Sequence, residues 1–278
     1  MSKNQTALKI DIDKVLASKS RTLSKFTPKF AINYLKRTVH QDELNALLEK
    51  YAGYTGVDFA EKLLHEFNVN CNITFEDRSA LLPSQKYIFV CNHPLGGLDG
   101  IIIINEISRL YNKKVMFVVN DLLMNIKPLE DIFIPVNTVK HGTMSKEYER
   151  RIEDAYLSSN QILYFPAGLC SRKINGSITD LEWKGGYIKQ ALKYNRSIVP
   201  MHFTGQNSNF FYRLANIRKA LGIKFNIEMI YLPDEMFRQK NRTFGLFVGK
   251  PIDIEEIRQT PNIRMWNQLI REKSYSLK

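Results

Sequence analysis

The sequence has little cysteine and no recognisable metal motif, and both features limit the classes of protein to which it can belong. Its 278 residues include only Cys71, Cys91 and Cys170, which are widely spaced and form no CxxC pair. A disulfide framework is therefore not expected, and a reducing compartment is the default. The five histidines lack a metal-ligand spacing such as HExxH, so no metal site is expected.

Long apolar runs are also missing. The most apolar stretch, residues 101–104, is ended by Asn105 and Glu106, whereas a membrane-spanning helix needs about 20 apolar residues. No apolar stretch follows the first lysines, so neither a signal peptide nor a transmembrane helix is expected. If this protein meets a membrane, we expect it to lie on the surface.

Acidic residues are scarce relative to basic ones, and the excess is unevenly distributed. The chain has 40 Lys and Arg against 28 Asp and Glu, a formal net charge of +12. Residues 1–40 hold nine basic and two acidic residues, which is +7 of that charge. Such asymmetry indicates an anionic partner, either a nucleic acid or a membrane surface, and does not distinguish the two.

The pattern of apolar residues changes near residue 68. Before it, residues 44–51 and 60–67 repeat at helical spacing, with Gly53 and Gly56 between them. After it, short β-rich runs alternate with helical segments, which is typical of a parallel sheet. We therefore expect an N-terminal helical hairpin over residues 1–68 and an α/β domain over 69–278. The fold class predicted is α/β, with a mixed, mostly parallel central sheet flanked by helices.

Individual elements follow from the same patterns. Strands are expected at residues 72–75, 87–91, 115–119, 162–165, 198–202, 227–231 and 244–248. Helices are expected at residues 99–111, 146–158, 185–193, 211–221 and 266–277.

The most informative segment is the strand over 87–91 and the residues that follow it. In open α/β sheets, ligands bind beyond the carboxyl ends of the strands, and His93 lies there. A histidine titrates near neutral pH and can take a proton from a hydroxyl group, and a carboxylate such as Asp99 would orient it. Residues six apart in one helix lie on different faces, so this contact requires a bend, which Pro94 and Gly96 permit.

Ordinary structural roles are open for the same residues. Asp99 is also a good N-cap for a helix that begins at Gly100. The alternative for His93 is a histidine at the strand end that bonds to backbone. Gly96 and Gly97 at a helix N-terminus suit any phosphate or carboxylate.

Four segments together resemble the PlsC-like glycerolipid acyltransferases. Residues 92–100 (NHPLGGLDG) resemble motif I, 133–137 (FIPVN) lie where motif II falls, 165–172 (FPAGLCSR) resemble motif III, and 198–201 (IVPM) resemble motif IV. The order and separations agree over residues 69–250. The five residues between histidine and aspartate are shared with a subgroup that includes lyso-ornithine- and lyso-glycine-lipid O-acyltransferases and that also carries the label "hemolysin".

The resemblance implies a mechanism without a covalent intermediate, metal or cofactor. His93 would be the general base on the hydroxyl of a lysolipid, Asp99 would orient it, and the acyl donor would be a thioester of acyl carrier protein or coenzyme A. The substrate-binding residues implied are Asn92, Gly96, Gly97, Asn137, Phe165, Pro166, Gly168, Ser171, Arg172 and Pro200.

Departures from the family motifs bear on the acceptor. Motif II of the phosphate-using members ends in Arg, whereas the matching region of this chain, residues 135–137 (PVN), has no Arg. Motif III normally carries Glu and Arg, where this chain has Ala167 and Cys170. Only Arg binds phosphate in a bidentate manner. A lysolipid with an amino-acid head group is therefore favoured, although Arg172 or Lys173 could bind a carboxylate or phosphate. The alternatives are a 1-acylglycerol-3-phosphate acyltransferase and a non-catalytic protein that binds membrane lipid.

Other readings of the sequence have less support. Ser171 lacks the Gly-x-Ser-x-Gly elbow of serine hydrolases, and Cys170 and His202 suit packing. No recognition motif supports nucleic-acid binding, so we expect an anionic membrane as partner and a peripheral location on the cytoplasmic face of the inner membrane. The aromatic and basic segment 209–221 suits either an interfacial helix or an ordinary core helix.

Overall fold

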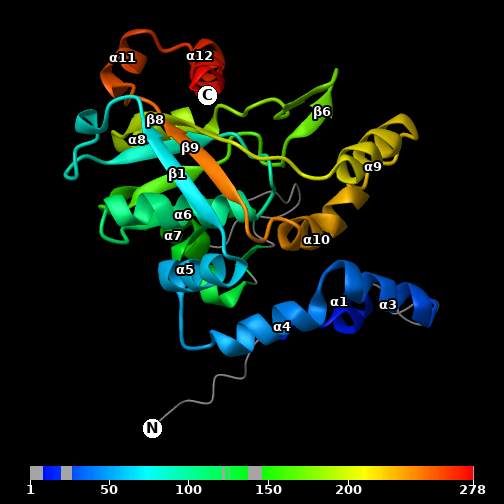
Figure 1. Cartoon of the computed structure of the whole chain (residues 1–278). Helices are drawn as coiled ribbons and strands as arrows, with labels where there is room; N and C mark the ends of the chain where they lie inside the picture. Colours follow the sequence, from blue (N-terminus) through cyan, green and yellow to red (C-terminus); the bar gives the residue numbers. More distant parts are fainter. Residues whose placement is uncertain (1–8, 20–26, 121–122, 125, 137–145, 278) are drawn as a thin grey trace.

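A seven-stranded sheet forms the centre of the molecule (Figure 1). The structure is a computed structural model that describes residues 9–19, 27–120, 123–124, 126–136 and 146–277. The strands of the sheet lie in the order β1-β9-β8-β2-β5-β3-β4. Their bounds are Asn70–Phe75 (β1), Tyr87–Cys91 (β2), Val115–Asn120 (β3), Phe133–Val136 (β4), Gln161–Tyr164 (β5), Ser197–Phe203 (β8) and Thr243–Val248 (β9).

Neighbouring strands of this sheet run parallel, except that β8 and β9 are antiparallel, with Met201 opposite Val248. The prediction of a mixed, mostly parallel sheet is therefore confirmed. The central strands β2 and β8 are buried along their whole length, which explains why both are continuous apolar runs.

Helices cover both faces of the sheet. Phe89 of β2 packs with α5 and α6, while its neighbour Ile88 packs with α7, α8, α11 and α12, because successive strand residues point to opposite faces. Figure 1 shows α5 and α6 on one side and α11 and α12 on the other. The helices are α1 (Ile12–Lys19), α3 (Lys29–Thr38), α4 (Gln41–Lys50), α5 (Gly56–Phe67), α6 (Leu98–Leu110), α7 (Lys146–Leu157), α8 (Gly186–Tyr194), α9 (Asn209–Ala220), α10 (Leu232–Phe237), α11 (Ile254–Gln259) and α12 (Ile263–Ser276).

One predicted strand is wrong. Residues 227–231 form a 3-10 helix, η4 (Ile227–Tyr231), because the segment contains a buried carboxylate, Glu228, that is held by two arginines. The elements that were not predicted include strand β4, the antiparallel hairpin of β6 (Arg172–Ile174) and β7 (Ser177–Thr179), and helices α10 and α11. Two further short 3-10 helices are η1 (Arg78–Ala80) and η3 (Lys127–Ile132).

The N-terminal helices α1, α3 and α4 lie together at the lower side of Figure 1. They reach the rest of the chain through His40, whose Nε2 lies 3.1 Å from Asp234 Oδ1 and whose ring stacks on Phe237. Helix α5 instead contributes Phe59, Leu64 and other side chains to the core beneath the sheet. The division at residue 68 stays a prediction. Within the described part of the chain, no helix is both long and apolar enough to cross a bilayer.

Candidate active site

Strand β2 leads directly into the predicted site. After Cys91, the side chain of Asn92 continues the pairing with β8: its Nδ2 donates to the Phe203 carbonyl at 2.9 Å, and its Oδ1 accepts from the Phe203 N–H at 2.7 Å. Both ends of the amide are therefore used within the protein. This pairing fixes where the chain leaves the sheet, one residue before His93.

His93 and Asp99 meet across a bend, as their spacing requires. His93 Nδ1 lies 3.0 Å from Asp99 Oδ2, and the same oxygen accepts the Leu95 N–H at 2.8 Å. Gly96 makes the bend with a φ of +81°, and a Cβ there would lie 2.8 Å from a Leu232 methyl carbon. Glycine is therefore needed at position 96 for both conformation and space.

Asp99 is not the N-cap of its helix. Helix α6 begins at Leu98 with Gly97 as its N-cap, so Asp99 lies in the first turn and is completely buried. Its Oδ1 accepts the Gly100 N–H at 2.9 Å. An ionised carboxylate only accepts hydrogen bonds, so His93 Nδ1 must donate, and the lone pair of the ring lies on Nε2.

Phe165 covers one face of the His93 ring. The ring centroids are 3.9 Å apart and stacked, and Phe165 directly follows β5, the parallel neighbour of β2. The side chain of His93 stays 14% exposed. The arrangement therefore fixes the plane of the imidazole while leaving part of the ring accessible.

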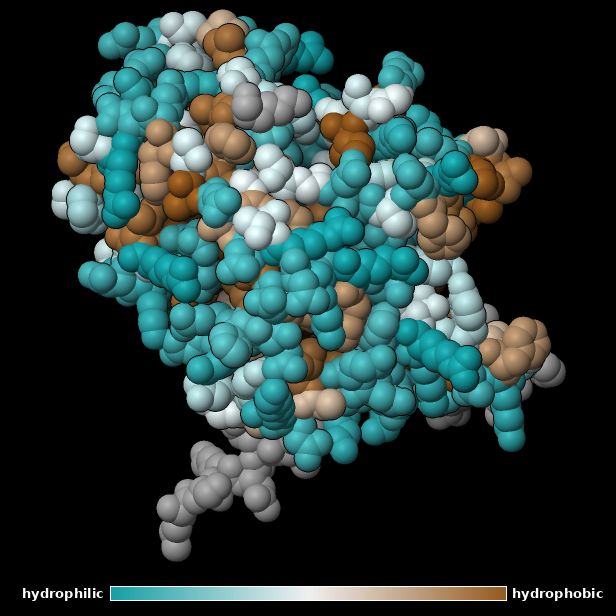
Figure 2. Space-filling view, viewed as in Figure 1, coloured by the Kyte–Doolittle hydropathy of each residue, from teal (hydrophilic) through white to brown (hydrophobic). Residues whose placement is uncertain are grey.

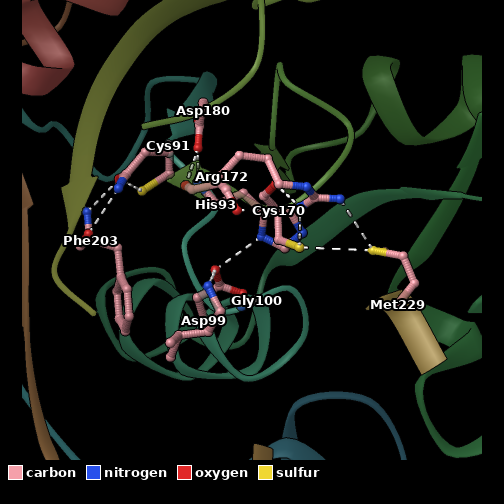
Figure 3. A network of polar contacts seen from close by, with 12 residues as sticks. Cys91, His93, Asp99, Gly100, Cys170, Arg172, Asp180, Phe203 and Met229 are labelled. Atoms are coloured by element: carbon pink, nitrogen blue, oxygen red, sulfur yellow. Dashed lines mark hydrogen bonds and ion pairs between the residues drawn. The ribbon is translucent and has the colours of Figure 1, made fainter. Parts of the chain in front are cut away.

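Asp180 is a residue of this site that the sequence did not reveal. Its Oδ1 accepts the His93 N–H at 3.1 Å and the Ser171 hydroxyl at 2.5 Å, and its Oδ2 accepts Trp183 Nε1–H at 2.8 Å. Ser171 N–H in turn donates to the His93 carbonyl at 2.7 Å. Figure 3 shows His93 between Asp99 and Asp180. Asp180 lies 87 residues from His93 in the chain, and no local motif marks it.

Burial raises the pKa of the Asp180 carboxyl, and the hydrogen bonds from Ser171 and Trp183 act in the opposite direction. Burial also raises the pKa of the Cys170 thiol, to about 11, against the lowering effect of Arg172. A thiol with that pKa stays protonated at neutral pH, which agrees with a packing role for Cys170.

Arg172 is committed to an internal ion pair. Its Nη2 donates to Glu228 Oε1 at 2.8 Å and its Nη1 to the Cys170 carbonyl at 2.6 Å. Glu228 is fully buried and also accepts from Arg218 Nε at 2.8 Å. The guanidinium of Arg172 therefore holds the loop after β5 in place and is not directed at a ligand.

The other predicted site residues are spread around His93. Pro166 is buried and its carbonyl accepts the Lys184 N–H. Gly168 has a φ of +68° in an exposed turn. Pro200 lies within β8 opposite Val90, and Asn137 lies outside the described residues. Within the described ranges, no group of three or more His, Cys, Asp and Glu side chains is placed to hold a metal ion.

Comparison with known proteins places this geometry in a family. The model of a family described as "Acyltransferase" matches residues 14–278. This chain belongs to the acyltransferase family. The acyltransferase is 44% identical over 268 residues to the lyso-glycine lipid O-acyltransferase of Phocaeicola vulgatus, covering 96% of this chain and 95% of that protein. It is 43% identical over 268 residues to the lyso-glycine lipid O-acyltransferase of Bacteroides thetaiotaomicron, covering 96% and 97%.

The prediction that this acyltransferase is an enzyme, an O-acyltransferase, is confirmed by these relatives and by the family. Among solved structures, the 1-acyl-sn-glycerophosphate (LPA) acyltransferase PlsC from Thermotoga maritima matches with a TM-score of 0.48 and 13% identity, over 95% of both chains. That similarity is too low to compare the two sites.

Proposed function

We propose that this acyltransferase transfers a fatty acyl group from an acyl carrier protein or coenzyme A thioester to the hydroxyl of a lyso-glycine lipid in membrane lipid biosynthesis. The observation that carries the proposal is the pairing of His93 Nδ1 with the buried Asp99 at 3.0 Å. It gives the partly exposed ring the tautomer of a general base. The names of the two relatives support the acceptor class.

The reaction then runs without a covalent enzyme intermediate. His93 Nε2 takes the proton of the acceptor hydroxyl while its oxygen attacks the thioester carbonyl. The C–S bond breaks, an ester C–O bond forms, and the proton on His93 passes to the leaving thiolate. Asp99 stabilises the imidazolium between these steps, as the aspartate does in a Ser-His-Asp triad.

Arg172 supports an acceptor without a phosphate. A phosphate acceptor needs a free guanidinium or an equivalent donor set, and the guanidinium of Arg172 is held by Glu228 and backbone carbonyls. Removing Arg172 from that pair would leave a buried carboxylate with one partner fewer, which is costly. A glycine head group carries no phosphate and does not need that donor set.

We place the enzyme on the anionic surface of a membrane, at the cytoplasmic face of the inner membrane. Its acceptor is a lipid, and the first 40 residues carry +7 of the net charge. Each Lys or Arg near an anionic surface contributes about 1 kcal/mol of binding.

The test of the mechanism is His93→Ala. Transfer should fall by at least about 100-fold, because a positioned general base contributes 10²–10⁴ in rate. The matched control is His65→Ala, which removes an exposed histidine of α5 and should leave transfer unchanged. Near-normal transfer by His93→Ala, at an unchanged melting temperature, would remove His93 from the mechanism, whereas a wild-type protein that binds lipid but transfers no acyl group from either donor would favour a non-catalytic lipid-binding role.

The test of the acceptor compares two lysolipids with the same purified enzyme. Lyso-glycine lipid should be acylated and lysophosphatidate should not, with each donor offered separately as the acyl carrier protein and the coenzyme A thioester. Preferential acylation of lysophosphatidate would overturn the amino-acid head group and support the phosphate acceptor instead.

A further inference from the structure

Helix α9 has apolar side chains on two opposite faces, and only one of them is buried. Phe211, Tyr212 and Ala215 face the protein. Phe210 and Ile217 are 52% and 57% exposed. Positions 217 and 221 lie seven and eleven residues after 210, which places each within about 20° of position 210, and the two within about 40° of each other, around a helix.

The chain after α9 extends the apolar stripe. Leu221 and Phe225 are 69% and 68% exposed, and Ile223 is also exposed. Figure 2 shows hydrophobic side chains gathered at the right edge of the molecule, over α9. We call these five side chains, together with the exposed basic residues among them, the α9 surface: Phe210, Ile217, Leu221, Ile223, Phe225, Arg213, Lys219 and Lys224.

The charge of the α9 surface has one sign. Residues 208–227 contain four basic residues and no acidic one. Of the four, Arg218 is held by Glu228, whereas Arg213, Lys219 and Lys224 are exposed. An apolar stripe flanked by exposed cations is the pattern of a helix that lies in the plane of an anionic lipid surface.

The α9 surface continues to the N-terminal helices. The ring of Phe210 contacts Tyr231 edge-on at 5.0 Å, and Tyr231 Oη lies 2.8 Å from Tyr34 Oη of α3. Tyr34 and Phe30, one turn before it, are 54% and 76% exposed. The exposed aromatic side chains of α3 therefore adjoin those of α9, next to the most basic part of the sequence.

The buried face of α9 touches the segment that holds the active site. Phe211 and Tyr212 pack with Cys170, and the Arg172 guanidinium lies 5.5 Å from the centre of the Phe211 ring. Ser171, between these two residues, donates its N–H to the His93 carbonyl. Only α9 itself separates the α9 surface from that segment.

We infer that the α9 surface docks on an anionic lipid bilayer, with its apolar side chains among the acyl chains and its cations against the head groups. The inference deepens the proposed function, on which it rests, by assigning lipid contact to a segment 170 residues away from the basic N-terminus. A lipid surface fits better than a folded protein partner, because exposed cations lie among the apolar side chains and residues 208–227 contain no acidic residue.

The experiment measures partition of the full-length protein to vesicles of phosphatidylglycerol and phosphatidylcholine, with no donor or acceptor present. The variant is Ile217→Gln, Leu221→Gln and Phe225→Gln, which preserves net charge. Its partition should fall at least about tenfold, since burying a single large apolar side chain contributes 1.5–3 kcal/mol and tenfold is 1.4 kcal/mol. The matched control, Leu82→Gln, Leu157→Gln and Leu269→Gln, removes three leucines that are 52%, 58% and 45% exposed elsewhere and should change partition less than about twofold.

A second variant, Arg213→Gln, Lys219→Gln and Lys224→Gln, should weaken partition to these vesicles and leave the weaker partition to pure phosphatidylcholine unchanged. The inference is overturned if the apolar variant binds like wild type at an equal melting temperature, or if the control variant loses as much. It is also overturned if the apolar variant turns a dimer into a monomer, or abolishes binding of acyl carrier protein, while vesicle partition stays the same. Because no substrate is present, a failure of acyl transfer leaves these results unaffected.

Discussion

At the scale of single residues, the site depends on how the lone pairs of Asp99 are used. One oxygen accepts from both His93 Nδ1 and the Leu95 N–H, and the other accepts from the Gly100 N–H. The sequence predicted the contact with His93, since a bend-permitting segment separates the two residues. It did not predict the backbone donors, because these depend on the exact path of the bend.

Asp99→Asn tests this arrangement. Asparagine has one acceptor oxygen, so its amide nitrogen must face at least one of the three N–H donors. Either orientation removes the negative charge that stabilises the imidazolium, and an amide nitrogen that faces His93 also gives the ring the wrong tautomer, so transfer should fall by about 10²–10⁴. A buried donor without a partner should also lower the free energy of unfolding by about 1–3 kcal/mol. Transfer is measured below the melting temperature of the variant, and a rate near that of wild type would contradict the orienting role.

Asp180 predicts a pH dependence of stability. Its pKa is raised, chiefly by burial, so its contribution to stability is fully present below the pKa of the unfolded carboxyl, about 3.9. That contribution is lost as the pH rises through the higher pKa of the folded protein. Stability of wild type relative to Asp180→Asn, measured by urea unfolding, should therefore decrease as the pH rises above about 4. A relative stability that increases over this range would contradict the burial argument.

At the scale of elements, helix α6 packs closely against strand β3 at Gly100, and the apolar pattern of the helix did not predict this close contact. A Cβ on Gly100 would lie 2.8 Å from Phe117 Cε1 and 3.6 Å from Phe165 Cε2. Phe165 is the ring that stacks on His93. Helix α6 and the His93 ring are therefore coupled through aromatic packing.

Gly100→Ala should lower the free energy of unfolding by about 1–3 kcal/mol, the usual cost of overpacking. Transfer should also fall, because a shift of Phe117 disturbs Phe165, against which it packs edge-on with the ring centroids 5.2 Å apart, and Phe165 supports the imidazole. Gly186→Ala is the control, since this glycine also lies in the first turn of a helix and its Cβ would meet only Tyr164 Oη, at 3.7 Å. That variant should be as stable as wild type or up to about 1 kcal/mol more stable. Equal stability losses in the two variants would mean that the close approach to Phe117 is not the cause.

The elements that the sequence predicted correctly are those whose apolar pattern reflects burial between two layers. β2 was predicted with its observed bounds, because its five consecutive buried residues, Tyr87–Cys91, form an apolar run that is visible in the sequence itself. The strand predicted at η4 failed because its apolar residues surround Glu228, whose two arginine partners come from β6 and α9. Contacts of that kind join distant parts of the chain, and a single sequence carries no local signal for them. The same reason explains why Asp180 was missed.

At the scale of the whole molecule, two interactions would bind the protein to the same membrane: electrostatic attraction, which acts over a long distance, and apolar contact, which acts only at short distance. The net charge of +12 attracts an anionic surface through solution, whereas the apolar stripe of α9 acts only on contact. Because Tyr231 links Phe210 to Tyr34, the two contributions come from adjoining parts of one side of the protein. Attraction by the basic N-terminus would therefore bring α9 to the bilayer.

Salt should separate these two contributions. Raising the ionic strength from about 0.1 M to about 1 M shortens the Debye length from about 10 Å to about 3 Å, so the part of vesicle partition that comes from charge should disappear. The apolar part remains, because burial of apolar surface is not screened. Wild-type protein should therefore keep a residual partition at high salt, and the Ile217→Gln, Leu221→Gln, Phe225→Gln variant should keep at most about a tenth of it. If the two proteins bind equally at high salt, α9 contributes no apolar contact, and charge alone holds the enzyme at the membrane.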